Sequence, residues 1–134
     1  MNYENGNAKY NMEVNKIEKT LHLSASGFFQ EEDGHSFIND YNKLVKTFNP
    51  NNFVLIIDLS NDLKPSTPAV AKELEELMVR YIEVPFRRRF LLTKGNVITL
   101  SQFKRLGRQI PGWDEGIEYA DHLQDVKNNL ASDN

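Results

Sequence analysis

The sequence of 134 residues contains no cysteine, which excludes disulfide bonds, thiolate metal sites and cysteine nucleophiles. No apolar run in it approaches the ~20 residues that a membrane-spanning helix requires. The first residues, Met1 to Lys9, are polar and lack the apolar segment of a signal peptide. A net charge of -3 gives no general attraction to nucleic acid or to anionic membranes. From these absences we expect a cytoplasmic protein without a membrane span.

The sequence also lacks a recognisable catalytic or metal-binding motif. Its histidines, His22, His35 and His122, are scattered, and no carboxylate pairing at metal-ligand spacing accompanies them, so we expect no metal site. His22 alternates with Ser24 and Ser26 along one predicted strand, a pattern typical of a sheet face and not of a catalytic triad. A Gly-rich phosphate loop is also missing. We therefore expect a protein that binds and does not catalyse, without a cofactor.

The other elements can be placed around one apolar run, Phe53 to Leu59, in which Asp58 is the single polar residue. Its β-branched residues and its length predict a strand buried on both faces, central in a sheet that helices cover. Upstream, alternation over Tyr10 to Val14 and again over Leu21 to Ala25 predicts two strands with one solvated face. Downstream, two further short strands are predicted over Arg88 to Thr93 and over Ile117 to Ala120.

Segments with helical periodicity separate these strands. An apolar stripe from Phe37 to Phe48 predicts the first helix, and acidic residues precede it where a helix N-terminus favours them. Thr67 predicts the N-cap of a second helix, because Pro68 follows at the first helical position. A third helix is expected over Thr99 to Gln109. The last is expected to begin at Asp121, with Gln124 completing a capping box.

The expected elements follow the order ββαβαβαβα. Alternating strands and helices require crossover connections, which are right-handed. The result is an α/β domain in which helices pack on a central mixed sheet of four or five strands. We expect this single domain to span residues 10–130, with disordered tails over residues 1–9 and 131–134.

A basic cluster is the sharpest charge feature. The stretch from Val84 to Trp113 contains no Asp or Glu. Five of its cations predict a surface for an anion or an acidic partner: Arg87, Arg89, Lys104, Arg105 and Arg108. The alternative is a solvated face balanced by the acidic helices. Aromatic residues are sparse among these cations, so nucleic-acid binding is not expected.

The element order and the turn after Asp58 resemble the STAS domain, the family of anti-sigma factor antagonists and of the cytosolic ends of sulfate transporters. In that family Asp-Ser-Ser-Gly opens the second helix, and its first Ser is phosphorylated. Here Ser66 stands at the position of the Asp and Thr67 at that of the phosphorylated Ser, while Pro68 and Ala69 replace the rest of the motif. The chain is also similar to a looser group of STAS-like bacterial domains.

The resemblance implies candidate phosphoacceptors, Thr67 and Ser66. Free N–H groups and the helix dipole would stabilise a phosphoryl group there, and the alternative is a plain N-cap. Asp58, Ser60, Ser66 and Thr67 form the predicted partner-binding loop. Asp58 ends the central strand, where open α/β sheets place ligand-facing groups. Alternatively, Asp58 stabilises the loop by accepting N–H bonds.

We therefore interpret the chain as a non-catalytic STAS-like interaction module with a regulatory role. The resemblance implies an anti-sigma factor or a switch kinase as the protein partner. The alternative is a domain that binds or senses a small anionic or amphipathic ligand, held between sheet and helices near the basic cluster. The sequence leaves the oligomeric state open, a homodimer included.

Overall fold

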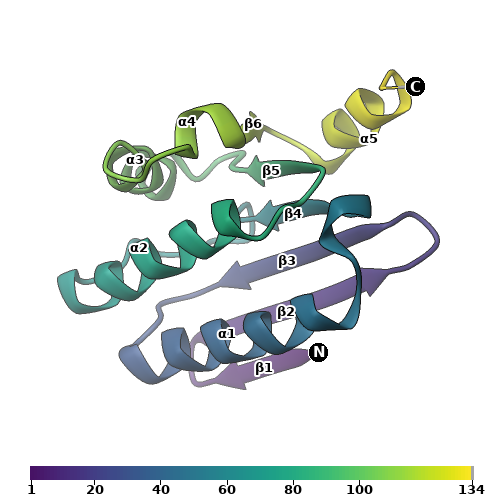
Figure 1. Ribbon diagram of the computed structural model, residues 1–134. Helices are drawn as coiled ribbons and strands as arrows, with labels where there is room; N and C mark the ends of the chain where they lie inside the picture. Colours follow the sequence, from purple (N-terminus) through teal and green to yellow (C-terminus); the bar gives the residue numbers. More distant parts are fainter. Residues whose placement is uncertain (134) are drawn as a thin grey trace.

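The computed structural model describes residues 1–133, which form a six-stranded mixed sheet with helices on both faces (Figure 1). The strands lie side by side in chain order. The first three pair antiparallel, and the last three continue parallel to the third. The α/β class predicted from the sequence is confirmed, with six strands in place of four or five. The strands are β1 (Asn2–Asn5), β2 (Ala8–Asn15), β3 (Thr20–Ser26), β4 (Val54–Asp58), β5 (Arg88–Leu92) and β6 (Glu118–Ala120).

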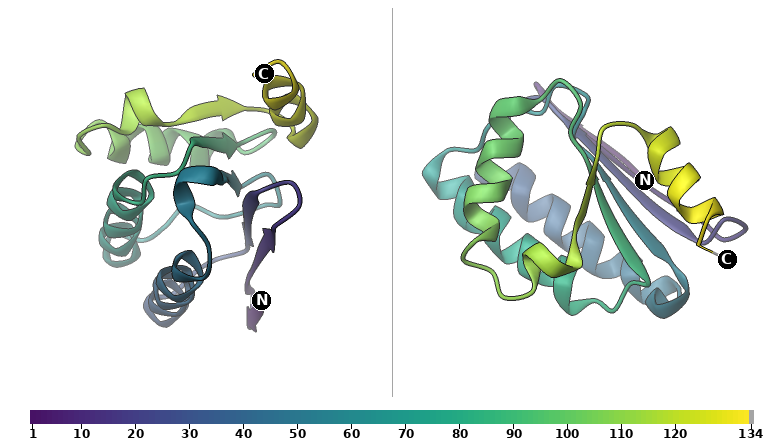
Figure 2. Two further views of the ribbon diagram at one scale, coloured as in Figure 1. Left: turned by 45° about the vertical axis from the view of Figure 1, so that its right-hand side comes forward. Right: turned by 90° about the horizontal axis from the view of Figure 1, so that it is seen from above.

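The helices divide unequally between the two faces of the sheet. Figure 2 shows the last helix alone on one side and the others together on the opposite side. Each parallel crossover moves one strand further in the same direction, so right-handed connections put their helices on one face. The last helix follows the final strand and can cover the other face. The helices are α1 (Glu31–Leu44), α2 (Pro68–Glu83), α3 (Val97–Gly107), α4 (Trp113–Gly116) and α5 (Leu123–Ala131), with short 3₁₀ turns at η1 (Val45–Thr47) and η2 (Pro50–Asn52).

β4 is buried on both faces, as its continuous apolar run predicts. Leu55 and Ile57 face the larger core beneath α1 to α4. Val54 and Ile56 belong to a smaller core with Val126 of α5. Because β4 contributes to both cores, it holds Asp58 and the start of the following loop in a fixed position.

Two N-caps were predicted, one correctly. Thr67 caps α2, with its Oγ1 accepting the N–H of Val70 at 3.4 Å, and Pro68 occupies the first turn. The cap predicted at Asp121 is wrong by one residue: His122 is the N-cap of α5. Asp125, not Gln124, completes the box, and its Oδ2 accepts the N–H of His122 at 3.1 Å. An ionised carboxylate at this position is the stronger acceptor and also suits the helix dipole.

The disordered N-terminal tail predicted over residues 1–9 is wrong, because this segment forms β1 and the start of β2. Tyr3 stacks on Tyr10 with ring centroids 4.6 Å apart. The Tyr3 hydroxyl also donates to Asp33 Oδ1 of α1 at 2.6 Å. Gly6 provides the hairpin turn with a φ of 59°, a conformation that glycine adopts without strain.

The C-terminal tail predicted over residues 131–134 is also wrong where the structure describes it. Ala131 lies within α5, and Asp133 Oδ2 pairs with Arg87 at 2.8 Å and with Arg88 at 3.2 Å. Asn134 lies outside the described residues. Over residues 1–133, no helix has both the length and the apolar character needed to cross a membrane.

Candidate functional site

An apolar cavity of about 70 Å³ lies between the sheet, α1 and α2. Apolar cavities of ~150 Å³ can hold a benzene molecule, so this one accepts only a few atoms unless the two helices separate. Its walls combine side chains of β3, β4, α1 and α2, among them Leu23, Phe37, Ile38, Ile57, Leu74 and Leu77.

Polar groups line one edge of this cavity, where β4 ends. They are Asp58, Lys64 and Ser66 from β4 and the loop that follows it, together with Glu73 of α2. This edge lies at the C-terminal ends of parallel strands, the place where open α/β sheets bind ligands. The structure thus brings two residues of the predicted partner-binding loop, Asp58 and Ser66, to the cavity.

Asp58 holds the start of this loop. Its Oδ1 accepts the N–H of Ser60 at 3.0 Å and the hydroxyl of the same residue, and its Oδ2 lies 3.5 Å from Nε2 of His22. Burial raises the pKa of Asp58, but His22 and the two bonds from Ser60 outweigh it and hold the pKa below its usual value. The carboxylate stands between imidazole and hydroxyl, whereas in a triad the imidazole contacts the hydroxyl.

Three polar side chains of α3 and its N-cap clamp the other end of the loop, and the sequence analysis missed them. Gln102 accepts the N–H of Ser66 at 2.8 Å and donates to its carbonyl at 3.0 Å. Asn96 and Thr99 both donate to the carbonyl of Leu63, at 2.9 and 2.7 Å. Thr99 is 1% exposed and Gln102 6%. The available signal was their spacing of three, which puts polar groups on the buried side of an amphipathic helix.

The candidate phosphoacceptors differ in access. Thr67 is exposed at the start of α2, whereas Ser66 is half-buried. The Thr67 hydroxyl already caps the helix through Val70. Modification of this hydroxyl would therefore exchange the cap for a phosphoryl group at the same helix end.

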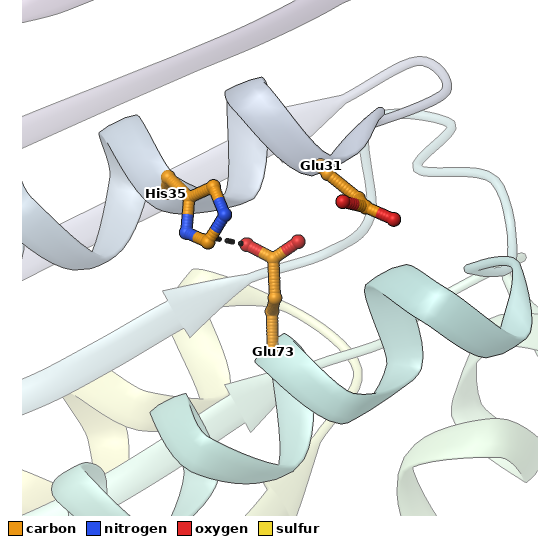
Figure 3. A group of neighbouring side chains, drawn as sticks. All are labelled: Glu31, His35 and Glu73. Atoms are coloured by element: carbon orange, nitrogen blue, oxygen red, sulfur yellow. Dashed lines mark ion pairs between the residues drawn. The ribbon is translucent and has the colours of Figure 1, made fainter.

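A buried carboxylate joins α1 to α2 beside the cavity. Glu73 is 12% exposed in its side chain, and its Oε2 lies 3.2 Å from Nδ1 of His35 (Figure 3). Burial raises the pKa of Glu73, and the neighbouring imidazole of His35 opposes this rise without cancelling it. Gly34 makes this approach feasible, because a Cβ there would lie 2.7 Å from Oε2 of Glu73.

The predicted basic surface is divided between different elements. Arg89 points toward the end of α2, where it donates to the carbonyls of Ile82 and Val84 at 3.1 and 2.9 Å. Arg87 pairs with Asp133, next to α5. The remaining three cations are exposed, Lys104 and Arg105 on α3 and Arg108 at its C-cap, with Nζ of Lys104 over the Tyr119 ring at 5.1 Å. None of the five predicted surface residues, Arg87, Arg89, Lys104, Arg105 and Arg108, lines the cavity.

The sheet order and helix placement define a SpoIIAA-like, that is STAS-like, α/β fold, which confirms the resemblance read from the sequence at the level of fold. The chain is similar to the solved structure of an uncharacterised protein of the DUF3478 family, with a SpoIIAA-like fold, from Shewanella loihica PV-4. The two superpose with a TM-score of 0.66 over 97% of this chain and 98% of the other, at 15% identity. At that identity the likeness shows the fold alone. No family model and no curated protein matches the sequence.

Proposed function

We propose that this domain is a non-catalytic binding module that takes the apolar part of a small amphipathic molecule between α1 and α2. The observation that carries the proposal is the apolar cavity with a polar edge at the end of β4. A well-formed apolar pocket with a few convergent polar groups is the usual form of a small-molecule site.

The charges at the edge argue for a ligand with a neutral or cationic head group. The carboxyl groups there are Asp58, with a lowered pKa, and Glu73. The one lysine at the edge, Lys64, already lies 3.0 Å from Asp62. None of the five cations of the basic cluster lines the cavity, so an amphipathic ligand fits the cavity better than an anionic one.

Binding of more than a few atoms requires α1 and α2 to move apart. Phe37 and Ile38 of α1 and Leu77 of α2 line the cavity from its two helical sides. The loop before α2 is held by α3 and by Asp58. We therefore expect the α1 side to open while the loop keeps the polar edge in place.

A series of eight-carbon amphiphiles tests this function. We expect octylamine and octanol to shift the methyl resonances of Ile38 and Leu77 in the full chain, and octanoate to shift them less, because carboxylates lie at the edge. Leu74→Phe should weaken binding by filling the cavity. Leu44→Phe is the matched control, since Leu44 packs on the same core without lining the cavity. Equal shifts in both variants, or shifts outside the cavity, would contradict the proposal.

A second candidate function is regulatory protein interaction, with an anti-sigma factor or a switch kinase as the partner that the STAS resemblance implies. The observation that favours it is the clamped loop, which presents exposed Thr67 at the start of α2. We expect protein from its own host to carry a phosphatase-sensitive phosphoryl group that Thr67→Ala removes and Ser66→Ala retains. An unmodified mass under every growth condition would count against this function.

A further inference from the structure

Glu73 is a buried carboxylate with too few partners. Both of its oxygens are shielded from solvent, and neither has a hydrogen-bond partner among the described residues. A buried charged group without compensating hydrogen bonds is costly. The nearby cation of α2, Arg80, pairs with Glu76 at 3.0 Å and does not serve Glu73. Within residues 1–133, His35 is the one ion-pair partner of Glu73.

A second carboxylate faces the same place. Glu31 precedes His35 by one helical turn, so both side chains project from the same side of α1. Figure 3 shows the Glu73 carboxylate reaching up from α2 toward His35, with the Glu31 carboxylate on its other side. One ligand atom from each of Glu31, His35 and Glu73 lies within 4.8 Å of the others. Two carboxylates beside one imidazole place negative charge where a bound cation could neutralise it.

We propose that Glu31, His35 and Glu73 bind a divalent transition-metal ion, with Zn²⁺ as the first candidate, in a site that links α1 to α2. One imidazole nitrogen and two carboxylate oxygens are a donor set that Zn²⁺ accepts, with water at the fourth position. Mg²⁺ and Ca²⁺ favour oxygen ligands alone and fit this set less well.

The geometry allows the ligands to close on an ion. Ligand atoms of a tetrahedral zinc site lie roughly 3.4 Å apart, so the three side chains must draw together from their present separation. Glu31 and His35 are exposed and free to adjust, whereas Glu73 is held between the helices. Gly34 keeps the approach to Glu73 open, because any larger residue would meet its carboxylate.

An ion at this position would fasten the edge of the cavity. Gly34 and Glu73 both line the cavity as well as the candidate metal site. The bound ion would neutralise the buried carboxylate and oppose separation of α1 from α2. The inference rests on these three side chains and holds whether or not the cavity takes a ligand.

The test is titration of the full chain with Zn²⁺ and Co²⁺, by calorimetry and by the visible absorption of bound Co²⁺. We expect one ion per chain, a Zn²⁺-dependent rise in melting temperature, and a shift of the His35 imidazole resonances. His35→Ala and Glu73→Gln should each weaken Zn²⁺ binding by at least ~10-fold. Loss of a residue that only contacts a metal ligand already costs ~10–100-fold in metal affinity. Mg²⁺ should produce no comparable rise.

Two matched variants separate this site from adventitious binding. His122→Gln removes another surface histidine, and Glu76→Gln removes an exposed carboxylate from the same helix. Both should bind Zn²⁺ as the unchanged chain does. The proposal is overturned if His35→Ala and Glu73→Gln bind as tightly as these controls. It is also overturned if the resonances of His22 or His122 shift in place of those of His35, or if no ion binds below millimolar concentration.

Discussion

Two regions of the molecule differ in how their buried space and charged groups are arranged: the filled end, around β6 and α4, and the hollow end, between α1 and α2. Around β6 and α4 the interior is filled by Trp113, whose Nε1 donates to the Tyr119 hydroxyl at 2.9 Å. Nearby, Arg88 forms two bonds with Glu118, at 2.8 and 2.6 Å. Between α1 and α2, by contrast, there is a cavity, and the carboxylate of Glu73 has no hydrogen-bond partner among residues 1–133. A filled, paired region stabilises the fold, whereas a hollow, under-paired one is where a ligand or an ion gains most by binding.

Removing the large side chain of the filled end should have the largest effect. Trp113 is fully buried and packs against Gly107, where a Cβ would lie 2.3 Å from the indole. We expect Trp113→Ala to lower the free energy of unfolding by about 3–5 kcal/mol in urea denaturation. Leu74→Ala, beside the cavity and partly exposed, should cost less than half as much. Equal losses would remove the distinction between the two ends.

Breaking the paired charges of the same end should cost less. Arg88→Met leaves Glu118 without its partner, but that carboxylate is 44% exposed, so solvent screens the interaction. We expect a loss of ~1 kcal/mol, reduced at high salt. A double-mutant cycle with Glu118→Gln measures the coupling between the two side chains. A coupling of zero would mean that the pair contributes nothing to the filled region.

The loop that closes the hollow end should be less sensitive still. Thr67 caps α2 through a long bond of 3.4 Å to the N–H of Val70. We expect Thr67→Ala to lower the free energy of unfolding by ~0.5 kcal/mol, the lower end of the range for N-caps. Ser66→Ala is the control, because its loop contacts run through its backbone. If Ser66→Ala lowered the free energy of unfolding more than Thr67→Ala, the assignment of the cap to Thr67 would be wrong.

Glu73→Gln should have the smallest effect and the opposite sign. Burial raises the pKa of Glu73, so the folded state holds this proton more tightly than the unfolded chain does. The ionised form therefore costs stability above the folded-state pKa, and the cost disappears below the unfolded value of about 4.3. With a chelator present, we expect Glu73→Gln to be more stable than the unchanged chain at pH 8, by less than ~1 kcal/mol, and equally stable at pH 3.5.

Urea denaturation at the two pH values measures this difference. A Gln variant that is less stable at pH 8 would show that the contact of the Glu73 carboxylate with the His35 imidazole outweighs the cost of burying the charge. The contact between Glu73 and His35 would then stabilise the fold, as the pair of Arg88 and Glu118 does, and the contrast between the two regions would weaken.

Local patterns were enough to predict the α/β class, the buried strand β4 and the start of α2. The run from Phe53 to Leu59 identifies a strand covered on both faces, and Thr67-Pro68 identifies a helix start. In each case the deciding interactions are burial of that segment or bonds within one turn, so neighbouring residues carry the information. β1 was missed because its polar residues carry no alternation, and its order comes from Tyr10 and Asp33, which lie elsewhere in the chain.

The candidate site could not be predicted in the same way. The sequence predicted no metal site: Glu31 and His35 stand one helical turn apart, but nothing local indicated that Glu73 of another helix would meet them. The clamp on the loop and the dispersal of the basic cluster likewise depend on which elements share a face. The sequence by itself determined the buried strand β4 and the start of α2, because burial patterns and caps are local. The tertiary structure alone decided the cavity and the buried carboxylate of Glu73 beside it, because both exist only where distant segments pack together.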